Sequence, residues 1–381
     1  MRSTIEPPAT IAVLGGGQLG RMFLQAAQRL GYRGLVLSAT PDDPAAQIAH
    51  EVIIGPPDSP AALKIISERA RAVTVEFENV SAPGLRWLSR RIPTRPGWRT
   101  VWTSQNRLRE KGFLARHQFP LAPWRPVRST TELQSSMLEL GLPLILKTAA
   151  SGYDGKGQIR VDQAENVESA WAKLRRVDCV AEAVVPFVAE VSVVVARGAD
   201  GQSVSYPVCL NRHSQHILDS TILPAPIGPF ASSQARALAL GVAEALNTVG
   251  VLTVEFFVFA DGSLAINELA PRPHNSGHAT IEASITSQYE QQVRALCGLP
   301  LGSTDLISPA AMVNLLGDVW SGGVPRWEQA FQADPGIKLH LYGKQIPEPG
   351  RKMGHLTVLD PSAENALLRA VAAKELLAVR S

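Results

Sequence analysis

Residues 143–158 read PLILKTAASGYDGKGQ, and this stretch predicts how the central part of the chain folds. An apolar run that ends in Lys147 is typical of a buried strand with an ammonium group at its tip. Glycines at 152, 155 and 157 follow, and glycine lets backbone N–H groups approach phosphate oxygens closely. Residues 158–162 then alternate in polarity like a second strand. We therefore expect a glycine flap over a nucleotide triphosphate, although a plain glycine-rich hairpin turn also fits these residues.

Length and composition favour an enzyme of several domains. The 381 residues are too many for one core, so two or three domains are expected. A net charge of +3 without any long Lys/Arg run gives no nucleic-acid surface. Cys179, Cys209 and Cys297 are isolated, which fits a reducing compartment. No leader or membrane-spanning pattern is present, so we expect a cytoplasmic protein without nucleic-acid or membrane partners.

The N-terminal part has the pattern of a strand, a glycine turn and a helix. Residues 10–15 are apolar, GGGQLG occupies 15–20, and apolar residues then recur at helical spacing. The strand at 34–38 ends in Ser38, where an NAD site would have an acid. A phosphate monoester could bind at the same turn instead, because the N-terminus of a helix holds an anion. Glu76 falls at the carboxyl end of a strand at 72–78, where it is a candidate contact for a substrate amine or ribose.

The sequence around residues 104–190 does not by itself show whether its charged residues have a functional role. A helix at 104–118 carries Arg107 and Lys111 one turn apart, and by themselves these are interpreted as solvated charges. Glu182 lies in an otherwise apolar strand that ends before a proline, which is typical of a hinge between domains. Glu190 opens the next strand, where it could accept hydrogen bonds from ribose hydroxyls.

A predicted hairpin brings two carboxylates together. Residues 251–260 and 263–270 are apolar runs separated by Asp261-Gly262, a strong hairpin signal. In a two-residue hairpin Glu255 lies opposite Glu268, and their mutual repulsion calls for a cation between them. Magnesium with ATP phosphates fits, because it takes few carboxylates. A shifted register, or one protonated glutamate, would also relieve the repulsion.

Two later segments supply more cations. Residues 269–278, LAPRPHNSGH, form an irregular loop that places Arg272 and His274 beside the predicted carboxylate pair. Residues 349–355, PGRKMGH, put two cations on a turn between predicted strands at 337–344 and 355–360. This turn is either a phosphate clamp or an exposed basic turn.

Together these motifs resemble the ATP-grasp superfamily. GGGQLGRM, GYDGKGQ, INELAPRPHNSGH and PGRKMGH, in this order over nearly the whole chain, closely resemble the 5-(carboxyamino)imidazole ribonucleotide synthase family of purine biosynthesis. The resemblance implies an α/β fold, α+β in its ATP-grasp part. It also implies a Rossmann-like N-terminal domain at 1–103 and an ATP-grasp small subdomain with the flap at 104–188. A large subdomain with a sandwich-like C-terminal part is expected at 189–381.

The resemblance also implies a ligand for most candidate residues. ATP contacts are expected from Arg107, Lys147, Gly152, Tyr153, Asp154, Gly155, Lys156, Gly157, Gln158, Glu182, Ala183, Val184, Val185, Glu190, His213, Asn267 and Glu268. Substrate contacts are expected from Gln18, Leu19, Glu76, Tyr153, Asp154, Lys156, Arg272, Asn275, Arg351 and Lys352. Magnesium would bind Glu255 and Glu268, and the catalytic candidates are Arg272, His274 and Lys352.

The activity implied is a ligase reaction. ATP and bicarbonate would give carboxyphosphate, which carboxylates the amine of 5-aminoimidazole ribonucleotide with release of ADP and phosphate. The resemblance also suggests a homodimer. Two residues depart from related patterns: Lys156 stands where the family often has arginine, and Ala270 where biotin carboxylases have asparagine.

Other functions explain fewer of the motifs. A formate-dependent glycinamide ribonucleotide transformylase shares the fold, flap and metal pair, but GYDGKGQ and HNSGH count against it. Biotin carboxylase is disfavoured by Ala270. A nicotinamide dehydrogenase would leave the carboxylate pair unexplained, and a non-catalytic nucleotide sensor would not need Arg272, Arg351 and Lys352.

Overall fold

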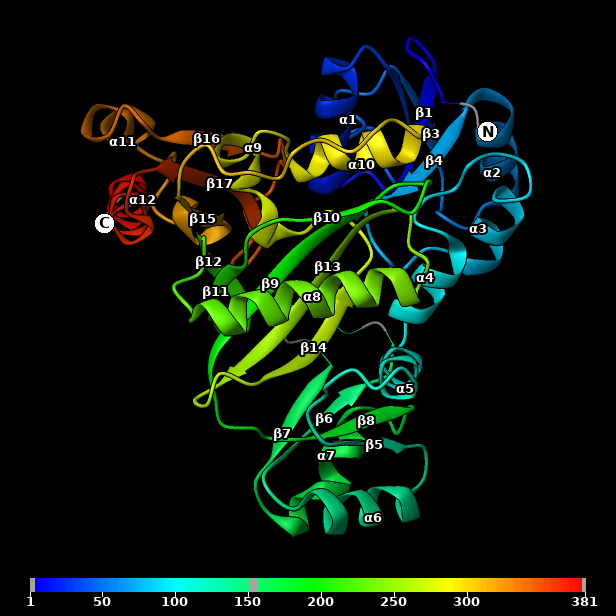
Figure 1. Ribbon diagram of the computed structural model, residues 1–381, viewed down its shortest axis with the longest axis vertical. Coiled ribbons are helices and arrows are strands. Elements are labelled where there is room, and N and C mark those ends of the chain that lie inside the picture. Colours follow the sequence, from blue (N-terminus) through cyan, green and yellow to red (C-terminus); the bar gives the residue numbers. More distant parts are fainter. Residues whose placement is uncertain (1–3, 151, 153–156, 379–381) are drawn as a thin grey trace.

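The structure is a computed structural model, and it describes residues 4–150, 152 and 157–378. In these residues the strands form three sheets that follow one another along the chain. Figure 1 shows an N-terminal lobe in blue, a lower lobe in teal and a long central sheet in green and yellow that continues into an orange and red lobe. The first sheet is parallel and the other two are antiparallel, as the predicted fold class requires.

The N-terminal sheet has the strand order β3-β2-β1-β4, which is typical of nucleotide-binding α/β folds. Its strands and helices are β1 (Thr10–Leu14), α1 (Gln18–Arg29), β2 (Arg33–Ser38), β3 (Glu51–Ile54), α2 (Pro60–Arg69), β4 (Ala72–Val75), α3 (Ala82–Leu88) and α4 (Trp98–Ser104). The strands are buried on both faces except at the edge strand β3, as expected for a parallel sheet covered by helices.

A helix from the C-terminal half fixes the N-terminal lobe in place. On α10 (Gln288–Cys297), Tyr289 and Val293 are buried in the same apolar cluster as Phe23 of α1. The side chain of Gln292 donates to the hydroxyl of Thr74 at 2.7 Å and accepts from the backbone N–H of Val251 at 2.6 Å. The first and third sheets are thereby joined through a buried amide.

The second sheet is small and carries the flap segment. Its order is β5-β8-β6-β7. Its elements are α5 (Arg107–Arg116), β5 (Trp124–Val127), α6 (Thr130–Leu140), β6 (Leu144–Thr148), β7 (Gln158–Val161), the short helix η1 (Ala164–Asn166), α7 (Val167–Lys173) and β8 (Cys179–Ala183). Lys147 pairs with Gln158 across β6 and β7, so the glycine segment between them joins two neighbouring antiparallel strands, as predicted.

The third sheet runs in the order β14-β13-β9-β11-β12-β15-β17-β16, with β10 beside β9. We expected a sandwich-like C-terminal part, and this is wrong. Because β15 pairs with β12, the C-terminal strands extend the same sheet instead of facing it. The strands are β9 (Phe187–Arg197), β10 (Ser203–Ser205), β11 (Cys209–Ser214), β12 (Ile217–Leu223), β13 (Gly250–Phe259), β14 (Leu264–Ala270), β15 (Ala310–Leu316), β16 (Lys338–Leu341) and β17 (Lys352–Leu359).

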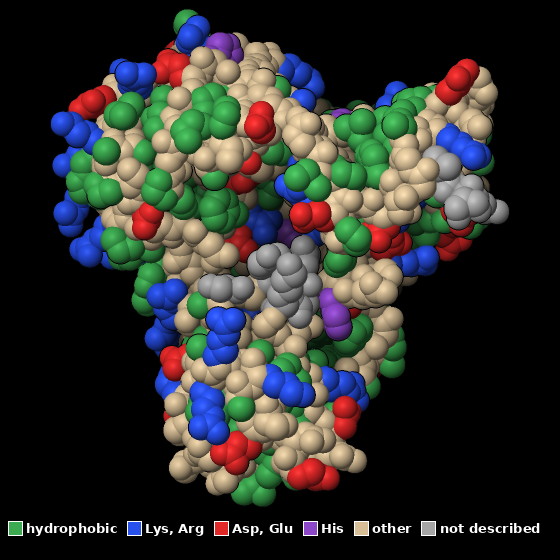
Figure 2. Space-filling view, turned by 180° about the vertical axis from the view of Figure 1, so that it is seen from behind, with side chains coloured by type: hydrophobic (Ala, Val, Ile, Leu, Met, Phe, Trp, Pro, Cys, Tyr) green, Lys and Arg blue, Asp and Glu red, His purple; other side chains and the backbone are tan. Residues whose placement is uncertain are grey.

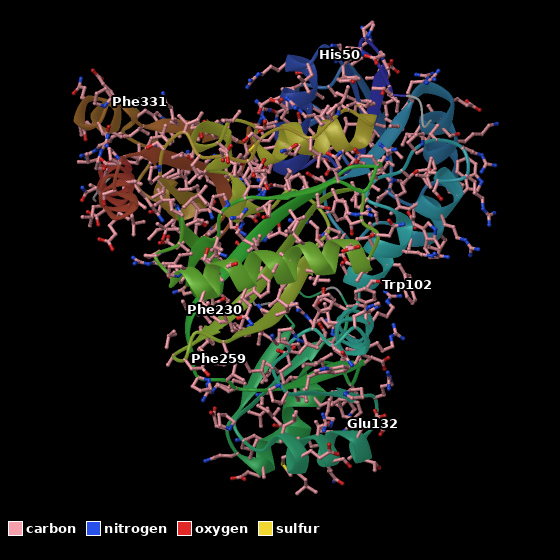
Figure 3. The ribbon with its side chains drawn as sticks, viewed as in Figure 1. His50, Trp102, Glu132, Phe230, Phe259 and Phe331 are labelled. Atoms are coloured by element: carbon pink, nitrogen blue, oxygen red, sulfur yellow. The ribbon has the colours of Figure 1, made fainter. Side chains whose placement is uncertain are left out.

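Helices cover this sheet. The remaining helices are α8 (Pro229–Ala245), α9 (Thr280–Ala283), α11 (Trp327–Ala333), α12 (Ala363–Leu377) and the short η2 (Asn275–Gly277) and η3 (Gly317–Trp320). Ala235 and Ala239, one turn apart on α8, are buried against apolar residues of β9 and β13. Small residues on this face let the helix lie close to the strands, while Phe230 near its start is exposed (Figure 3). Within the described part of the chain, no helix combines the length and apolar composition that crossing a membrane requires.

Gly15→Ala tests the glycine turn of the first sheet. Gly15 has a φ of +112°, and a Cβ there would lie 2.3 Å from Cγ of Glu76. We expect a lower thermal unfolding midpoint and a free energy of unfolding that is smaller by at least about 1–2 kcal/mol. An L-residue in this conformation is already strained, and the clash with Glu76 adds to the strain. Thermal unfolding followed by circular dichroism measures the shift.

Gly112→Ala is the matched control. Gly112 lies inside α5, and a Cβ added there would meet no described atom within 4 Å beyond the backbone of the helix itself. The same change should raise stability there by about 0.5–1 kcal/mol, because alanine is the better helix former. Shifts of equal sign and size in the two variants would contradict our account of the turn.

Candidate active site

A cavity of about 950 Å³ lies where the three sheets meet. It is bounded by the glycine turn before α1, the ends of β6 and β7, the hairpin β13–β14 and the turn before β17. From behind, Figure 2 shows a hollow above the lower lobe in which cationic, acidic and histidine side chains gather. Charged groups from distant parts of the sequence, from Glu76 to Lys352, therefore face one volume.

Most predicted site residues line this cavity. They are Gln18, Leu19, Glu76, Arg107, Lys147, Gly152, Gln158, Glu190, His213, Glu255, Asn267, Glu268, Arg272, His274, Asn275, Arg351 and Lys352. Gly157 and the hinge residues Glu182, Ala183, Val184 and Val185 do not line it. Tyr153, Asp154, Gly155 and Lys156 lie outside the described residues.

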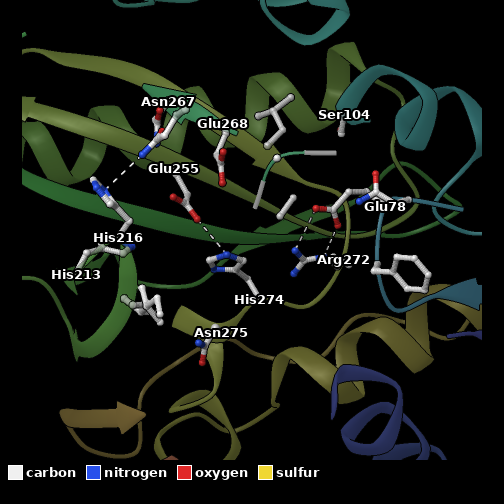
Figure 4. A pocket seen from close by; sticks show the side chains of 18 of the residues that line it. Glu78, Ser104, His213, His216, Glu255, Asn267, Glu268, Arg272, His274 and Asn275 are labelled. Carbon is white, nitrogen blue, oxygen red and sulfur yellow. Dashed lines mark hydrogen bonds and ion pairs between the residues drawn. The ribbon is translucent and has the colours of Figure 1, made fainter. Parts of the chain in front are cut away.

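The two hairpin carboxylates do share the cavity, but the predicted register is wrong. Near the base of the hairpin, Thr253 pairs with Ala270 as predicted, whereas nearer the tip Phe256 pairs with Ile266. The loop therefore holds one more residue than expected, and the mismatch appears as a bulge in β14, where Asn267 and Glu268 together lie opposite Glu255. Figure 4 shows the carboxylates of Glu255 and Glu268 pointing into the same part of the pocket.

Each of these carboxylates has a cationic or proton-donating partner. Oε2 of Glu268 lies 2.9 Å from Nη1 of Arg107, and Oε1 of Glu255 lies 3.0 Å from Nε2 of His274. Burial alone would raise the pKa of Glu268, but Arg107 outweighs burial and lowers it. Glu268 is thus held as a carboxylate.

A chain of hydrogen bonds fixes the tautomer of His274. The backbone N–H of Ser276 donates to Nδ1 of His274, and the Ser276 hydroxyl lies 2.9 Å from the same atom. Asn211 donates to the Ser192 hydroxyl, which lies 2.8 Å from the Ser276 hydroxyl. Because donors converge on Nδ1, the proton of a neutral His274 sits on Nε2, facing Glu255 and the cavity.

Helix α5 contributes a buried charged face. Arg107, Glu110 and Lys111 occupy positions i, i+3 and i+4, so they point the same way. Lys111 is 1% exposed and Glu110 is 2% exposed. The interpretation of Arg107 and Lys111 as solvated charges is wrong, because each forms an ion pair with a glutamate of a different sheet.

Glu182 is bound by two lysines. Its Oε1 lies 2.9 Å from Nζ of Lys111, and its Oε2 lies 2.8 Å from Nζ of Lys147. Burial would raise the pKa of Glu182, but the two ammonium groups hold it at about 2. The hinge glutamate therefore stays ionised even though it is 3% exposed.

Glu76 closes the glycine turn of the first sheet. Its carboxylate accepts from the backbone N–H groups of Gly17 and Gly20. Glu76 thus occupies two of the N–H groups of the turn, and a phosphate monoester bound at this turn stays a prediction. Burial raises the pKa of Glu76 despite these two hydrogen bonds.

Arg272 and the basic turn reach the cavity differently. Arg272 donates through Nε to Oε2 of Glu78 at 2.6 Å, which ties the site loop to the N-terminal lobe (Figure 4). Burial would raise the pKa of Glu78, but Arg272 lowers it. Lys352 is the first residue of β17, so one of the two cations predicted on the turn lies on a strand instead.

His213 faces Glu190 on the neighbouring strand. Its Nδ1 lies 3.3 Å from Oε2 of Glu190. Burial alone would lower the pKa of His213, but the hydrogen bond that His213 donates to Glu190 outweighs burial and raises it. The pair places a proton donor and an acceptor at the edge of the cavity.

Three residues that line the cavity or support it were missed from sequence. Glu78 follows Glu76 by two residues at the carboxyl end of β4, and this spacing could have indicated it. Glu110 is separated by one turn from Arg107, which is a weak signal by itself. Phe187 stacks on Phe257 with ring centroids 4.6 Å apart, and no local pattern reveals that pairing.

Family models match consecutive parts of the chain. The ribonucleotide synthetase preATP-grasp domain matches residues 8–105, and the ATP-grasp domain matches residues 112–289. The phosphoribosylaminoimidazole carboxylase C-terminal domain matches residues 310–369. These matches confirm the ATP-grasp fold that the motifs predicted.

Individual relatives cover nearly the whole chain. The N5-carboxyaminoimidazole ribonucleotide synthase of Bacillus subtilis (strain 168) is 40% identical over 362 residues, 94% of this chain and 93% of that protein. An N5-carboxyaminoimidazole ribonucleotide synthetase crystallised with ADP has a TM-score of 0.93 at 41% identity, covering 98% of each chain. The Aspergillus clavatus synthase, crystallised with ADP and 5-aminoimidazole ribonucleotide, has a TM-score of 0.87 at 29% identity, covering 97% of this chain and 98% of that one.

Glu110→Gln tests the charge state of the α5 face. Burial raises the pKa of Glu110 from its ordinary 4.5 to about 8. The unfolded chain loses this proton near pH 4.5 while the folded protein keeps it. The stability that Glu110 contributes is therefore complete below pH 4.5 and is lost as pH rises to about 8.

Glutamine keeps the shape and has no proton to lose. Relative to wild type, the variant should become more stable as pH rises from 5 to 8, by up to about 1.4 kcal/mol per pH unit. Thermal unfolding of both proteins across this range measures the difference. A difference that does not change with pH would show that Glu110 is not protonated in the fold.

Proposed function

Because the chain belongs to the N5-carboxyaminoimidazole ribonucleotide synthase family, we propose that its cavity carboxylates 5-aminoimidazole ribonucleotide with ATP and bicarbonate. The chain is an ATP-dependent ligase of purine biosynthesis. One observation carries the proposal for the site: the lysine of the flap strand, the hairpin carboxylates and the first two residues of α1 all line a single cavity. Nucleotide and substrate can therefore meet in one place.

ATP is proposed to bind between the second and third sheets. Lys147 and Arg107 enter from one side, and Glu190, His213, Asn267 and Glu268 from the other. The predicted contacts from 152–158 and 182–185 would close around the phosphates and the base. The cationic groups suit phosphate oxygens, whose charge spreads as the γ-phosphoryl group is transferred.

The donor atoms of the hairpin fit magnesium. Oδ1 of Asn267 is buried and has no hydrogen-bond partner among the described residues, and it lies next to Glu268 in sequence. No group of three or more metal-ligating His, Cys, Asp or Glu side chains occurs in the described part of the chain. Magnesium typically binds one or two protein carboxylates and completes its coordination with phosphate oxygens and water. When bound to Glu255 and Glu268, the ion would offset phosphate charge and leave Arg107 for the nucleotide.

The ribonucleotide is proposed to lie toward the N-terminal lobe. Gln18, Leu19 and Glu76 line that end of the cavity, opposite Arg272, Asn275, Arg351 and Lys352. Cationic side chains suit the 5′-phosphate of the substrate, and Glu76 can accept from its amine or ribose. Tyr153, Asp154 and Lys156 are proposed to complete the pocket.

The chemistry is proposed to run in two steps. A bicarbonate oxygen attacks the γ-phosphorus and ADP leaves, which gives carboxyphosphate. The substrate amine then bonds to the carboxyl carbon, directly or after release of carbon dioxide; phosphate leaves and the amine loses a proton. Lys147 and Arg272 stabilise the developing negative charge. His274 carries its proton on Nε2 beside Glu255, so it can orient bicarbonate or pass a proton at that atom.

The resemblance further suggests a cytoplasmic homodimer. Sedimentation of the purified chain tests the assembly, and a monomer at micromolar concentration would rule out the homodimer.

Phosphate release tests the substrate and the metal pair. With ATP, magnesium and bicarbonate, release should depend strongly on 5-aminoimidazole ribonucleotide and be lost in Glu268→Ala, because a metal-binding carboxylate is removed. Glu244→Ala removes an exposed glutamate of α8 and should turn over like wild type. Stimulation by formate with glycinamide ribonucleotide, and none by the aminoimidazole, would instead favour the transformylase.

His274→Gln tests proton transfer. The amide keeps a donor toward Glu255 but cannot exchange a proton, so kcat should fall by about 10²–10⁴ with little change in KM for ATP. Steady-state ADP formation gives both constants. His117→Gln, an exposed histidine directly after α5, is the control. A variant with wild-type kcat would leave His274 with an orienting role alone.

A further inference from the structure

Behind the cavity, three side chains form a buried charge cluster. Lys147 lines the cavity, whereas Glu182 and Lys111 do not. Each oxygen of Glu182 is taken by a different lysine, at 2.8 Å for Lys147 and 2.9 Å for Lys111. The cluster therefore contains two ammonium groups for one carboxylate, and Lys111 is the member farthest from any ligand.

The excess positive charge of this cluster faces the cavity. Lys111 and Glu182 are 1% and 3% exposed, so water cannot screen them well. Lys147 has further N–H donors that Glu182 does not use, and these are on the side of the cavity. Because Lys111 forms an ion pair with Oε1 of Glu182 and repels Lys147, the excess positive charge of the cluster is presented to the cavity.

We propose that Lys111 is a positioning residue for ATP, which keeps Lys147 directed at the phosphates by sharing Glu182 with it. This inference rests on the proposed function, because it takes the cavity to hold a nucleotide. Without Lys111, both oxygens of Glu182 turn to Lys147. The two then form a closed neutral pair that attracts phosphate weakly.

The position of α5 supports this role. The same helix face carries Arg107, which pairs with Glu268 at 2.9 Å, and Glu110, which accepts from the backbone N–H of Leu269 at 3.1 Å. Helix α5 is thereby attached to β14, which lines the cavity, and through Lys111 to β8, which does not line it. Lys111 is thus held by a helix that is fixed to both strands, so it can set the place of Glu182.

Lys111→Met is the decisive variant, because methionine has a similar length and no charge. Titration calorimetry with magnesium-ADP should show binding weakened by roughly tenfold or more, since a nearby charge is lost in a poorly screened site. KM for 5-aminoimidazole ribonucleotide should stay near its wild-type value. Lys111→Arg keeps the charge and should bind within about threefold of wild type.

A second change separates positioning from folding. In Lys111→Met/Glu182→Gln, the carboxylate that would capture Lys147 is gone, so magnesium-ADP affinity should recover most of the loss. A merely structural role predicts the opposite, because a second buried change adds damage. Thermal unfolding of each variant confirms that the titrated protein is folded.

The outcomes are distinguishable. Unchanged magnesium-ADP affinity in Lys111→Met, or failure of the second change to restore it, would overturn the inference. Wild type that binds magnesium-ADP but is not stimulated by the ribonucleotide would overturn the proposed substrate, while the lysine titrations still decide the role of Lys111. Absence of magnesium-ADP binding by wild type would overturn both.

Discussion

Compensation of buried and half-buried carboxylates is the constraint on which this site depends. Glu76, Glu78, Glu182, Glu255 and Glu268 come from three sheets, and each would be costly to bury unpaired. Backbone N–H groups satisfy Glu76, arginines satisfy Glu78 and Glu268, lysines satisfy Glu182, and His274 faces Glu255. Because most partners lie on a different element from the acid, the ion pairs also hold the sheets around the cavity.

This arrangement suits a ligase that handles several anions. ATP, bicarbonate and a ribonucleotide phosphate, the proposed ligands, all carry negative charge. In a site that contained only unpaired cations, these cations would repel one another whenever the ligands were absent. Here Arg107 and Lys147 are paired with carboxylates in the described structure. In the proposed function, nucleotide and metal take over these partners, so the cations need little movement to change from internal pairs to ligand contacts.

The single continuous sheet gives the site its geometry. Strands β9, β11 and β13 carry Glu190, His213 and Glu255, and the bulge in β14 opposite Glu255 lets Asn267 and Glu268 both line the cavity. On the far side, α10 and the Arg272–Glu78 pair hold the N-terminal lobe against this sheet. These contacts fix the proposed substrate end of the cavity relative to its proposed nucleotide end.

Local sequence determined the elements and most of the site: the parallel α/β start, the flap strands around Lys147, the β13–β14 hairpin and the loop with Arg272 and His274. Glycine spacing, apolar periodicity and a turn dipeptide are local signals, so they can be recognised without knowledge of the tertiary structure. Tertiary structure decided the bulge in β14 opposite Glu255, the burial of Lys111 against Glu182, the hydrogen bonds from the glycine turn to Glu76 and the continuity of the long sheet. These features depend on charges and strands that are distant in sequence. Pairing such charges becomes strongly favourable only after packing has excluded water from them.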